Sequence, residues 1–492
     1  MGVIRILKRP DALLLIGATM LTALLWQFRL RFPFDDTFIS FRYAEHLASG
    51  HGLVWNIGGP HTEGYTNFLF IALLSIARWV TSDLLAVSQL IGLVSTIATG
   101  ILLYRTAAII RGKKAGVLAA LLYFLTPLTW INALSGMETS LFVMLVVLAI
   151  SRVAKGEMRA AYAIAVLATL TRPEGALLAV VILIAQLRSA VKNDRVKMVG
   201  TQGSLSAWMI WFVFPSLLYA AWKYFYFGAL LPNSFYVKVL DTAHSVLPGL
   251  QYVRLFVTSV LILISASLGI RSLRDSSLFT SLLWVAAITV FYLFVLPLEG
   301  LYDRFLWPAF AVLCMTAAVG IIDVNERWKG GIFYPAFILL AAHILLVSLS
   351  PRTNQSLAAH EDIWDASMDK IITQLKSLSH SDSLLVGYGD AGYVVYKTGM
   401  QYLDLFGLND MRIAHAKSRE ARAAIVKAER PDILLLPVRL SDTGFVLIED
   451  AYGLARTHQF VANRYIDAFP YPLGVFVNRD SHYAADLLWR PW

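Results

Sequence analysis

Residues 84–104 read LLAVSQLIGLVSTIATGILLY, an uncharged and mostly apolar run. A transmembrane helix needs about 20 such residues, because each adds about 1.5 Å towards a hydrocarbon core about 30 Å thick. This run has the required length, and Arg105 follows it directly. Comparable runs recur from Ala12 to Ser350. The sequence therefore predicts an α-helical protein that crosses the membrane many times.

The composition agrees with this expectation. Of the 492 residues, 57% are hydrophobic and 15% are charged, against about 45–50% and about 25% in ordinary soluble domains. An ordinary cytosolic enzyme is thereby excluded. The single cysteine, Cys314, lies in an apolar run, which excludes disulfides and thiolate metal sites. Most of the basic excess behind the net charge of +9 lies in short loops, where it sets topology and does not indicate nucleic-acid binding.

Basic clusters between the apolar runs mark the cytoplasmic loops under the positive-inside rule. The clusters are Arg105/Arg111/Lys113/Lys114, Arg152/Lys155/Arg159, Arg188/Lys192/Arg195/Lys197, Arg271/Arg274 and Arg327/Lys329. Placing all the clusters on one side requires the chain to cross the membrane an odd number of times between Phe32 and Arg105. Residues 84–106 supply one crossing, so we interpret the apolar residues 67–80 as a helix that lies at the outer interface and does not cross. About eleven spans are then expected, near 12–28, 84–106, 115–133, 139–153, 160–171, 174–187, 207–227, 251–270, 278–297, 305–322 and 332–350.

The N-terminal run from Ala12 to Phe28 follows Arg5, Lys8 and Arg9 and could pass for a signal peptide. No small-residue cleavage site follows it, so we expect a retained first helix. With about eleven spans, the N-terminus is expected in the cytoplasm. The domain that follows the last span is then expected outside, in the periplasm of a bacterial cell with this chain in its inner membrane.

Residues 1–350 form the expected transmembrane domain, and residues 351–492 differ from it in character. Their short apolar runs alternate with polar helical stretches such as Ser418–Arg430; the runs include Leu384–Gly387, Val394–Tyr396 and Ile433–Pro437. This alternation predicts a soluble α/β domain. Its length is sufficient for a hydrophobic core of its own.

The first outer loop, residues 31–66, carries two adjacent carboxylates, Asp35 and Asp36, where the chain leaves the membrane. One interpretation is a helix cap, in which Asp36 accepts hydrogen bonds from a helix that begins at Thr37. A cap uses one carboxylate and leaves Asp35 unexplained. The other interpretation is a general base, or a ligand for a cation or for sugar hydroxyls, at the edge of the bilayer.

The same loop contains three of the ten histidines of the chain, His46, His51 and His61, among other polar residues. Their spacing matches no zinc signature, and oxygen ligands would favour a cation such as Mg²⁺, Mn²⁺ or Ca²⁺. An ordinary polar loop explains the histidines as well as a metal does. The sequence therefore leaves a metal requirement open.

Four further outer turns carry charges near the membrane, at Glu138, Arg172/Glu174, Lys238 and Arg304. A helix cap at Glu138, a salt bridge across Pro173 and snorkelling cations at Lys238 and Arg304 are the structural alternatives. Ionisable groups near hydrocarbon are costly, so they often mark functional sites. Carboxylates and cations in one outer site suit a substrate with a hydroxyl nucleophile and a phosphate leaving group.

Several of these motifs occur together, in order. In the first outer loop they are Asp35–Ala44 (DDTFISFRYA), Gly50–Asn56 (GHGLVWN) and Glu63–Asn67 (EGYTN). Further matches are Gly136–Thr139, Thr171–Gly175, Pro232–Ser234 with Lys238, Arg304–Pro308, Gly389–Gly392 and Leu403–Asp410. This set resembles the GT-C membrane glycosyltransferases, and within them the branch of mycobacterial terminal β-arabinofuranosyltransferases and type IV pilin arabinosyltransferases.

The resemblance implies transfer of a sugar, with arabinofuranose the best match, from a polyprenyl-phosphate donor to an acceptor glycan or protein outside the membrane. A hexose or mannose is the alternative sugar, and a monomer among membrane lipids is expected. No nucleotide-binding glycine motif occurs in the sequence, in line with a lipid-linked donor. A transporter or lipid flippase is the alternative from another class, but its charges would lie near the bilayer midplane in repeated, broken helices.

The residues allow a division of roles in such a reaction. We expect Asp35 to act on the acceptor hydroxyl, with Asp36 as its partner or as a substrate ligand. Donor phosphate binding is expected of Arg172, Lys238 and Arg304, because cations stabilise the charge on a leaving phosphate. Sugar or acceptor binding is expected of Arg42, His51, Glu63, Tyr65, Glu138, Glu174 and Asn233.

Replacing Asp35 by Asn is thus predicted, from the sequence, to abolish sugar transfer while leaving the protein inserted and folded. Incorporation of radiolabelled sugar from a purified lipid-phosphate donor measures this. Near-normal turnover by the folded variant would show that Asp35 is not the general base.

Overall fold

In a computed structural model of the chain, the described residues are 33–192, 205–237, 247–267, 276–295, 304–328, 368–378, 383–416, 418–441, 444–447, 460–466 and 473–489, with positions 17, 335, 338 and 342. The expected spans 12–28 and 332–350, apart from these four positions, lie outside the described residues. The expected domain boundary near residue 350 and Lys238 lie outside them as well.

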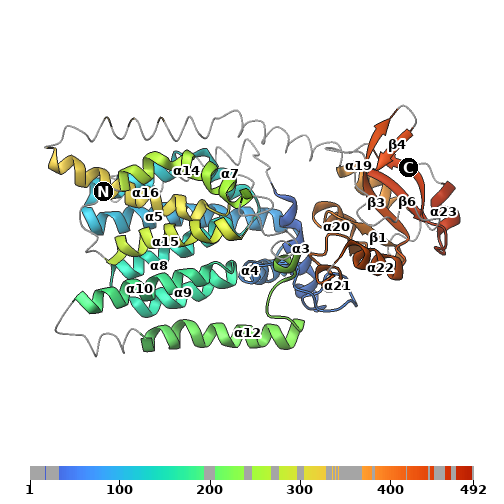
Figure 1. The fold of residues 1–492 in the computed structure, drawn as a ribbon, viewed down its shortest axis with the longest axis horizontal. Coiled ribbons are helices and arrows are strands. Elements are labelled where there is room, and N and C mark those ends of the chain that lie inside the picture. The colour runs from blue at the N-terminus through green and yellow to red at the C-terminus, as the bar shows by residue number, and fades with distance from the viewer. Residues whose placement is uncertain are drawn as a thin grey trace.

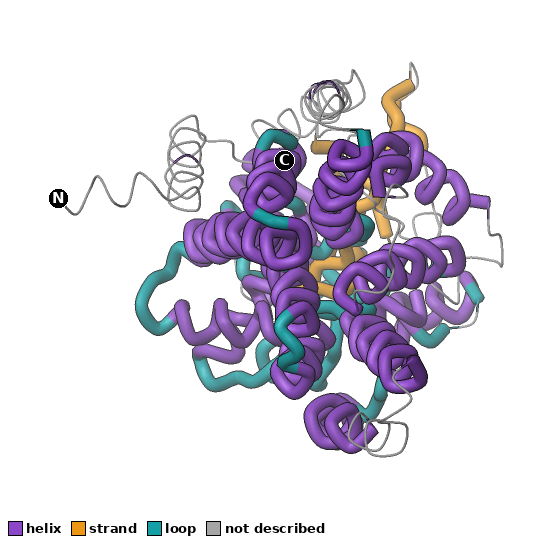
Figure 2. Tube along the Cα trace, turned by 90° about the vertical axis from the view of Figure 1, so that its left-hand side faces the viewer, coloured by secondary structure: helices purple, strands orange, loops and turns teal. Residues whose placement is uncertain are grey.

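The first part of the chain is a bundle of helices whose axes run side by side (Figure 1), as the view along the bundle shows (Figure 2). Its elements are α3 (Asp35–Ala48), α4 (Phe68–Arg78), α5 (Leu84–Arg111), α6 (Lys113–Phe124), α7 (Pro127–Leu134), α8 (Thr139–Ala154), α9 (Met158–Thr171), α10 (Gly175–Lys192), the π-helix η1 (Met209–Val213), α12 (Phe214–Phe227), α13 (Asn233–Phe235), α14 (Leu247–Ser267), α15 (Ser276–Phe294) and α16 (Trp307–Arg327).

Nine of the expected spans fall on described residues, and each coincides with a helix or a pair of helices. Within the described residues, five helices are long and apolar enough to cross a membrane, or six if the bent pair α6 and α7 forms one span. This pair turns by 62° just before Pro127, because proline removes a backbone donor and cannot continue the helix from Phe124. The apolar helices α8, α9 and α10 are shorter, and residues 67–80 contain the separate helix α4, as expected.

Helix α16 lies at the centre of the bundle, where it packs against α5, α6, α8, α14 and α15. Its side chains from Trp307 to Ile322 are buried. At Gly320, a Cβ atom would lie 1.9 Å from the carbonyl oxygen of Ala266 in α14. Glycine therefore allows these two backbones to approach, as small residues commonly do between membrane helices.

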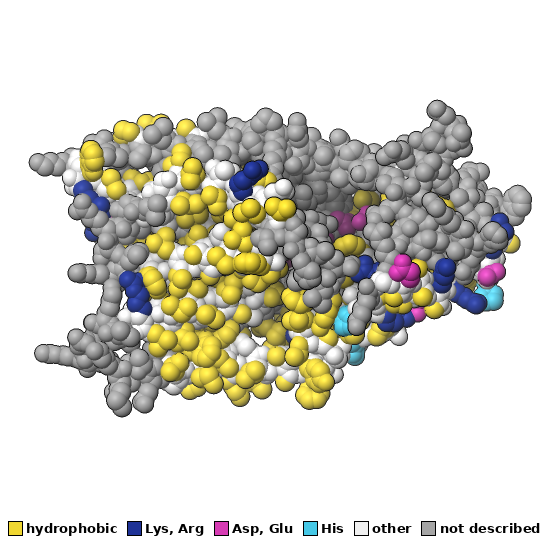
Figure 3. Space-filling model, viewed as in Figure 1, with side chains coloured by type: hydrophobic (Ala, Val, Ile, Leu, Met, Phe, Trp, Pro, Cys, Tyr) yellow, Lys and Arg dark blue, Asp and Glu magenta, His cyan; other side chains and the backbone are white. Residues whose placement is uncertain are grey.

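The outer surface of the bundle is apolar. Helix α12 with η1 is the clearest case, since Met209, Trp211, Phe214, Leu217 and Phe225 all expose their side chains. Figure 3 shows apolar side chains over the length of the bundle, with few charged side chains among them and several on the other part of the chain. An exposed apolar surface of this extent requires lipid around it. The protein is a polytopic helical membrane protein.

The two ends of the bundle differ in charge. At one end, Arg111 pairs with Asp323 and its Nη2 lies 3.1 Å from Glu326 Oε2, so the last turns of α5 and α16 lie together. The residues that begin or precede α8, α10 and α16 lie together at the opposite end, where Glu138, Glu174 and Arg304 line one cavity. The basic loop residues and the charged outer turns are thus separated along the bundle.

The C-terminal domain contains a six-stranded sheet with strand order β2-β1-β3-β6-β5 and β4 beside β3. Strand β1 is parallel to β2 and β3, whereas β6 is antiparallel to β3 and β5. The strands are β1 (Leu385–Tyr388), β2 (Gln401–Asp404), β3 (Ile433–Ser441), β4 (Gly444–Leu447), β5 (Phe460–Ile466) and β6 (Leu473–Asn478). The helices are α19 (Met368–Lys376), α20 (Tyr393–Thr398), α21 (Met411–Ala414), α22 (Arg419–Glu429) and α23 (Ala484–Trp489).

The expected α/β character is confirmed for this domain. The polar stretch Ser418–Arg430 contains α22, and the Oγ of Ser418 caps it by accepting a hydrogen bond from the N–H of Ala421. The short apolar run Val394–Tyr396 is not a strand of the sheet but lies in helix α20. One face of this short helix is buried against α3, which explains an apolar run outside the sheet.

Hydrogen bonds join the C-terminal domain to the first outer loop. The buried guanidinium of Arg42 in α3 donates to the carbonyl oxygens of Val395 (3.1 Å) and Met400 (2.9 Å) in the C-terminal domain, and to that of Trp55 (2.7 Å) in its own loop. The side chain of Asn56 exchanges two hydrogen bonds with the backbone of Tyr402. Each bond satisfies a backbone group that would otherwise be buried without a partner.

A second connection involves Asp404 at the end of β2. Its buried carboxylate accepts hydrogen bonds from the backbone of Phe406, Gly407 and Asn409, and burial nevertheless raises its pKa to about 6. The same carboxylate accepts a bond from the amide of Asn409, whose oxygen lies 3.1 Å from the hydroxyl of Tyr43 in α3. The segment Leu403–Asp410 is thereby fixed on the first outer loop.

A third contact predicts a sensitive glycine. The Asp35 carboxylate accepts a hydrogen bond from the N–H of Tyr393 (2.8 Å), and a Cβ atom on Gly392 would lie 2.0 Å from Asp35 Oδ2. Gly392→Ala should therefore loosen α20 from α3, with a destabilisation of about 1–3 kcal/mol, as for other overpacked contacts. Faster hydrogen exchange of the amides of Tyr393–Thr398 would report this.

Gly389→Ala is the matched control, because nothing lies within 4 Å of a Cβ atom built on Gly389. Equal exchange rates in the two alanine variants would contradict the importance of this contact.

Candidate active site

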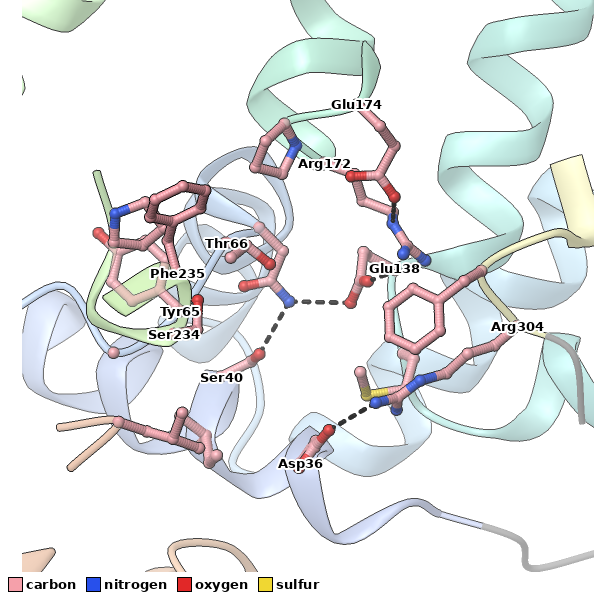
Figure 4. A pocket seen from close by; sticks show the side chains of 18 of the residues that line it. Asp36, Ser40, Tyr65, Thr66, Glu138, Arg172, Glu174, Ser234, Phe235 and Arg304 are labelled. Atoms are coloured by element: carbon pink, nitrogen blue, oxygen red, sulfur yellow. Dashed lines mark hydrogen bonds and ion pairs between the residues drawn. The ribbon is translucent and has the colours of Figure 1, made fainter. Parts of the chain in front are cut away.

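A cavity of about 240 Å³ lies where the bundle meets the first outer loop and the C-terminal domain. Its polar lining comes from α3, the turns before α8 and α10, α13, α15 and the segment before α16; the residues are Asp36, Ser40, Tyr65, Thr66, Asn67, Glu138, Arg172, Glu174, Ser234, Tyr292 and Arg304. Its apolar lining includes Ile39, Leu231, Phe235, Val295, Phe305 and Leu408. Figure 4 shows these side chains converging from separate segments.

Arg172 is held by a network of buried partners. Pro173 ends α9, so Arg172 and Glu174 fall in a tight turn before α10. The Nε atom of Arg172 donates to Glu174 Oε1 (2.7 Å), and its Nη2 donates to the hydroxyl of Tyr292 (3.2 Å), which itself donates to Glu174. Glu138 lies farther away, with Oε1 3.8 Å from Arg172 Nη1. The turn therefore presents a fixed cation to the cavity.

Arg304 supplies a second buried cation, from the segment before α16. Its Nη2 donates to Asp36 Oδ2 (2.8 Å). The ring of Phe305 lies close to both guanidinium groups, with its centroid 4.7 Å from Arg172 Cζ and 4.9 Å from Arg304 Cζ. Such cation–π contacts stabilise guanidinium groups that have lost water.

Each of these arginines has one N–H group without a hydrogen-bond partner among the described residues, Nη1 of Arg172 and Nε of Arg304. Both atoms are buried, and buried charged donors are normally paired. Guanidinium donors beside a cavity match the oxygens of a phosphate or a carboxylate. The cavity is therefore suited to an anion at this side.

Asn67, which lines the cavity, joins two of its segments. Its amide donates to Ser40 Oγ (3.0 Å) and to Glu138 Oε2 (3.0 Å), as the dashed lines in Figure 4 show. These bonds fix the junction between the first outer loop and the turn before α8. Glu138 thus has an amide partner as well as the nearby guanidinium of Arg172.

The opposite side of the cavity is formed by Tyr65 and the α13 segment. Next to Tyr65, the Oε2 of buried Glu63 lies 2.7 Å from the Nζ of Lys223 in α12. Burial raises the pKa of Glu63 to about 7, although Lys223 opposes this shift. The backbone oxygen of Glu63 accepts a hydrogen bond from the N–H of Asn233 (3.0 Å), which ties α13 to the loop.

The two adjacent aspartates have different surroundings. Helix α3 begins at Asp35, before the expected start at Thr37, and its preceding residue Phe34 makes no side-chain cap. Asp36 lines the cavity and pairs with Arg304, whereas Asp35 bonds to Tyr393 of the C-terminal domain. Only one carboxylate of the pair therefore faces the cavity.

Four other predicted site residues among those described, Arg42, His51, Glu63 and Asn233, are not part of the cavity lining. Arg42 connects the loop to the C-terminal domain, His51 is exposed, and Lys238 lies outside the described residues. The other loop histidines have local partners, since His46 Nδ1 is 2.8 Å from the Val54 oxygen and His61 stacks on Tyr226. No three His, Cys, Asp or Glu side chains in the described residues come together as a metal-binding group.

The sequence interpretation missed Asn67, Lys223 and Tyr292. Lys223 carried a usable signal, because a lysine inside an apolar helix requires a partner or a route to water. Asn67 ends the Glu63–Asn67 motif of the first outer loop but was given no role, and Tyr292 carried no signal, since a single polar residue in an apolar span has many ordinary explanations. Their roles become visible only when α4, α8, α10 and α15 are packed together.

Solved structures with a similar fold include three that cover most of this chain. ArnT from Cupriavidus metallidurans bound to undecaprenyl phosphate aligns with a TM-score of 0.63 at 14% identity, covering 97% of this chain and 99% of that one. The apo oligosaccharyltransferase of Archaeoglobus fulgidus aligns at 0.56 and 12% identity, covering 87% and 69%. Archaeoglobus fulgidus AglB with an inhibitory peptide and a dolichol-phosphate aligns at 0.55 and 12%, covering 90% and 76%.

These similarities, at such low identity, concern the fold, and they confirm the GT-C-like architecture that the sequence predicts. A family model described as a domain of unknown function, DUF8728, matches residues 364–483 in the C-terminal domain. A search of curated proteins finds none that matches this chain in sequence.

The environment of Glu63 predicts a pH dependence. Because the pKa of Glu63 rises from 4.5 to about 7 on folding, the folded state binds a proton more tightly than the unfolded state between these values. The free energy of unfolding should therefore fall as pH rises from about 4.5 to about 7, and stay level above. Glu63→Gln should reduce this slope in thermal unfolding of detergent-solubilised protein, and the slope that remains below about pH 6 is expected from Asp404, whose pKa burial raises to about 6.

Glu420→Gln, at an exposed position in the C-terminal domain, is the control and should retain the slope of the original protein. A Glu63→Gln variant with an unchanged slope would show that another group causes it.

Proposed function

We propose that this protein is a membrane glycosyltransferase that transfers a sugar from a polyprenyl-phosphate donor to an acceptor hydroxyl in a glycan or protein. The observation that carries the proposal is the pair of buried arginines, each with a guanidinium nitrogen that makes no hydrogen bond among the described residues, beside the cavity carboxylate Asp36. This arrangement combines an anion-binding side with a proton acceptor. Both are needed to displace a phosphate with a poorly acidic nucleophile.

The donor class is supported by the similar folds. The ArnT structure holds undecaprenyl phosphate and the AglB structure holds a dolichol-phosphate and a peptide. In the present chain, Leu231, Phe235 and Val295 line the same cavity as the arginines. Apolar walls next to an anion site suit a phosphate attached to a prenyl chain.

For an acceptor hydroxyl, the reaction can be written on the residues of this cavity. The acceptor oxygen bonds to the anomeric carbon, the bond from that carbon to the phosphate oxygen breaks, and the acceptor proton passes to Asp36. Polyprenyl phosphate leaves with the electron pair of the broken bond. Arg172 and Arg304 stabilise the charge on the phosphate, Lys238 is proposed to assist them, and Glu138 and Glu174 orient the cations.

The position of the carboxylates leads us to assign the proton acceptor to Asp36 and a positioning role to Asp35. Asp35 bonds to the backbone of Tyr393, so it couples the start of α3 to the C-terminal domain. The sequence alone assigns the general base to Asp35, whereas the structure favours Asp36. Mutation of each aspartate separates these two assignments.

The finer identity of the substrates rests on the loop motifs. Their resemblance to arabinofuranosyltransferases makes arabinofuranose the first sugar to test, and a hexose is the alternative. The positive-inside rule places the cavity and the C-terminal domain outside the cytoplasm, in the periplasm if the chain lies in a bacterial inner membrane. The protein is proposed to act as a monomer.

Asp36→Asn should lower kcat by about 10²–10⁴-fold, the usual contribution of a general base. Asp35→Asn keeps an oxygen that can accept the Tyr393 N–H bond, so it should retain most of the activity. Transfer of radiolabelled arabinofuranose from its polyprenyl-phosphate donor, with protein in vesicles, measures both variants.

The reverse order, with Asp35→Asn inactive and Asp36→Asn active, would return the base to Asp35. Vesicles that take up label without forming product would identify a transporter and exclude the proposed enzyme.

A further inference from the structure

Two neutral hydrogen-bond donors on the loop side of the cavity are buried without a hydrogen-bond partner among the described residues. They are the hydroxyl of Tyr65, whose residue lines the cavity, and Nδ2 of Asn233, which lies between the lining residues Pro232 and Ser234. The two side chains are 4% and 2% exposed. Because buried polar groups are normally paired, this part of the wall lacks groups that a ligand can supply.

The charged residues beside these atoms neutralise each other. Glu63 and Lys223 form an ion pair at 2.7 Å, with side chains 6% and 10% exposed. The backbone of Glu63 also bonds to Asn233, and Tyr65 follows two positions later. The ion pair therefore adds no net charge beside the backbone that carries Tyr65 and Asn233.

The two sides of the cavity thus select different ligand groups. On the arginine side the unpaired donors are cationic and suit an anion. On the loop side the unpaired groups are a neutral hydroxyl and a neutral amide, which suit hydroxyl groups. An ammonium group placed here would lose its hydration without gaining a free carboxylate, because Lys223 already occupies Glu63.

We propose that Tyr65 and Asn233 form a subsite for hydroxyl groups of an uncharged sugar, and that Lys223 determines this specificity by neutralising Glu63. The inference rests on the proposed glycosyltransferase function and deepens it by naming the charge class of the transferred sugar. It also orients the donor, with the phosphate at Arg172 and Arg304 and the sugar towards Tyr65.

Binding of two lipids to the full-length protein in nanodiscs tests the subsite. The probes are undecaprenyl phosphate and the same lipid carrying arabinofuranose. Tyr65→Phe should weaken binding of the sugar-bearing lipid by about fivefold to tenfold, the value of one buried hydrogen bond, and leave the bare lipid phosphate within about twofold. Tyr224→Phe is the matched control, because Tyr224 is exposed on α12.

A second measurement tests Lys223. The probes are the arabinofuranosyl lipid and an analogue in which one sugar hydroxyl is replaced by an amino group. The original protein should prefer the uncharged sugar, and Lys223→Met should shift the affinity ratio towards the amino sugar by about tenfold, because Glu63 is then left unpaired. Lys223→Arg should keep the original preference, and Lys370→Met at an exposed site is the control.

The outcomes separate the two proposals. If Tyr65→Phe weakens both lipids equally, or if a Lys223→Met variant with a normal thermal midpoint keeps the original preference, the subsite assignment is wrong and the donor class stands. A preference of the original protein for the amino sugar would overturn the subsite as well. If the original protein binds neither lipid, the proposed glycosyltransferase function fails with it.

Discussion

The buried cations at one end of the bundle impose the main constraint on this structure. Removing a guanidinium from water costs several kcal/mol unless carboxylates and hydrogen-bond acceptors surround it. Arg172 meets this requirement through Glu174 and Tyr292, and Arg304 meets it through Asp36. The partners come from α3, the turn before α10, and α15, so satisfying these charges determines how the helices assemble at this end of the bundle.

The same constraint gives the charged residues of the cavity defined partners. Each carboxylate of its lining already has a cationic or amide partner, and Phe305 contacts both guanidinium groups. Donors that are fixed before a substrate binds need no reorganisation when charge develops on it. In such a site, the folding free energy of the bundle holds the donors in place before a substrate binds.

Much of this arrangement was predictable from the sequence. Apolar length identified the spans, Pro173 identified the turn that presents Arg172 and Glu174, and the charge pattern separated the two ends of the bundle. The partner of each aspartate was not predictable from their adjacency. Neighbouring residues on a helix point about 100° apart, so Asp35 and Asp36 at the start of α3 have different partners although they are adjacent.

The contacts of Arg42 could not be predicted for a different reason. Its acceptors, the carbonyls of Val395 and Met400, lie more than 350 residues away, and backbone carbonyls leave no trace in a sequence. Lys223 and Glu63 are likewise far apart in the sequence. A lysine in an apolar helix does indicate that it has a partner, but not which residue that partner is. Local patterns therefore gave the positions of the site residues, and only packing gave their partners.

The hydrogen bonds at Arg42 and Asn56 have a consequence for how such a protein can evolve or be recombined. The first outer loop supplies the donors, and the backbone of α20 and β2 supplies the acceptors. A different C-terminal domain grafted onto this bundle would bury the Arg42 guanidinium without its acceptors unless it reproduced the same backbone path. The loop and the C-terminal domain are therefore expected to be inherited as one unit, whatever lipid-facing helices they accompany.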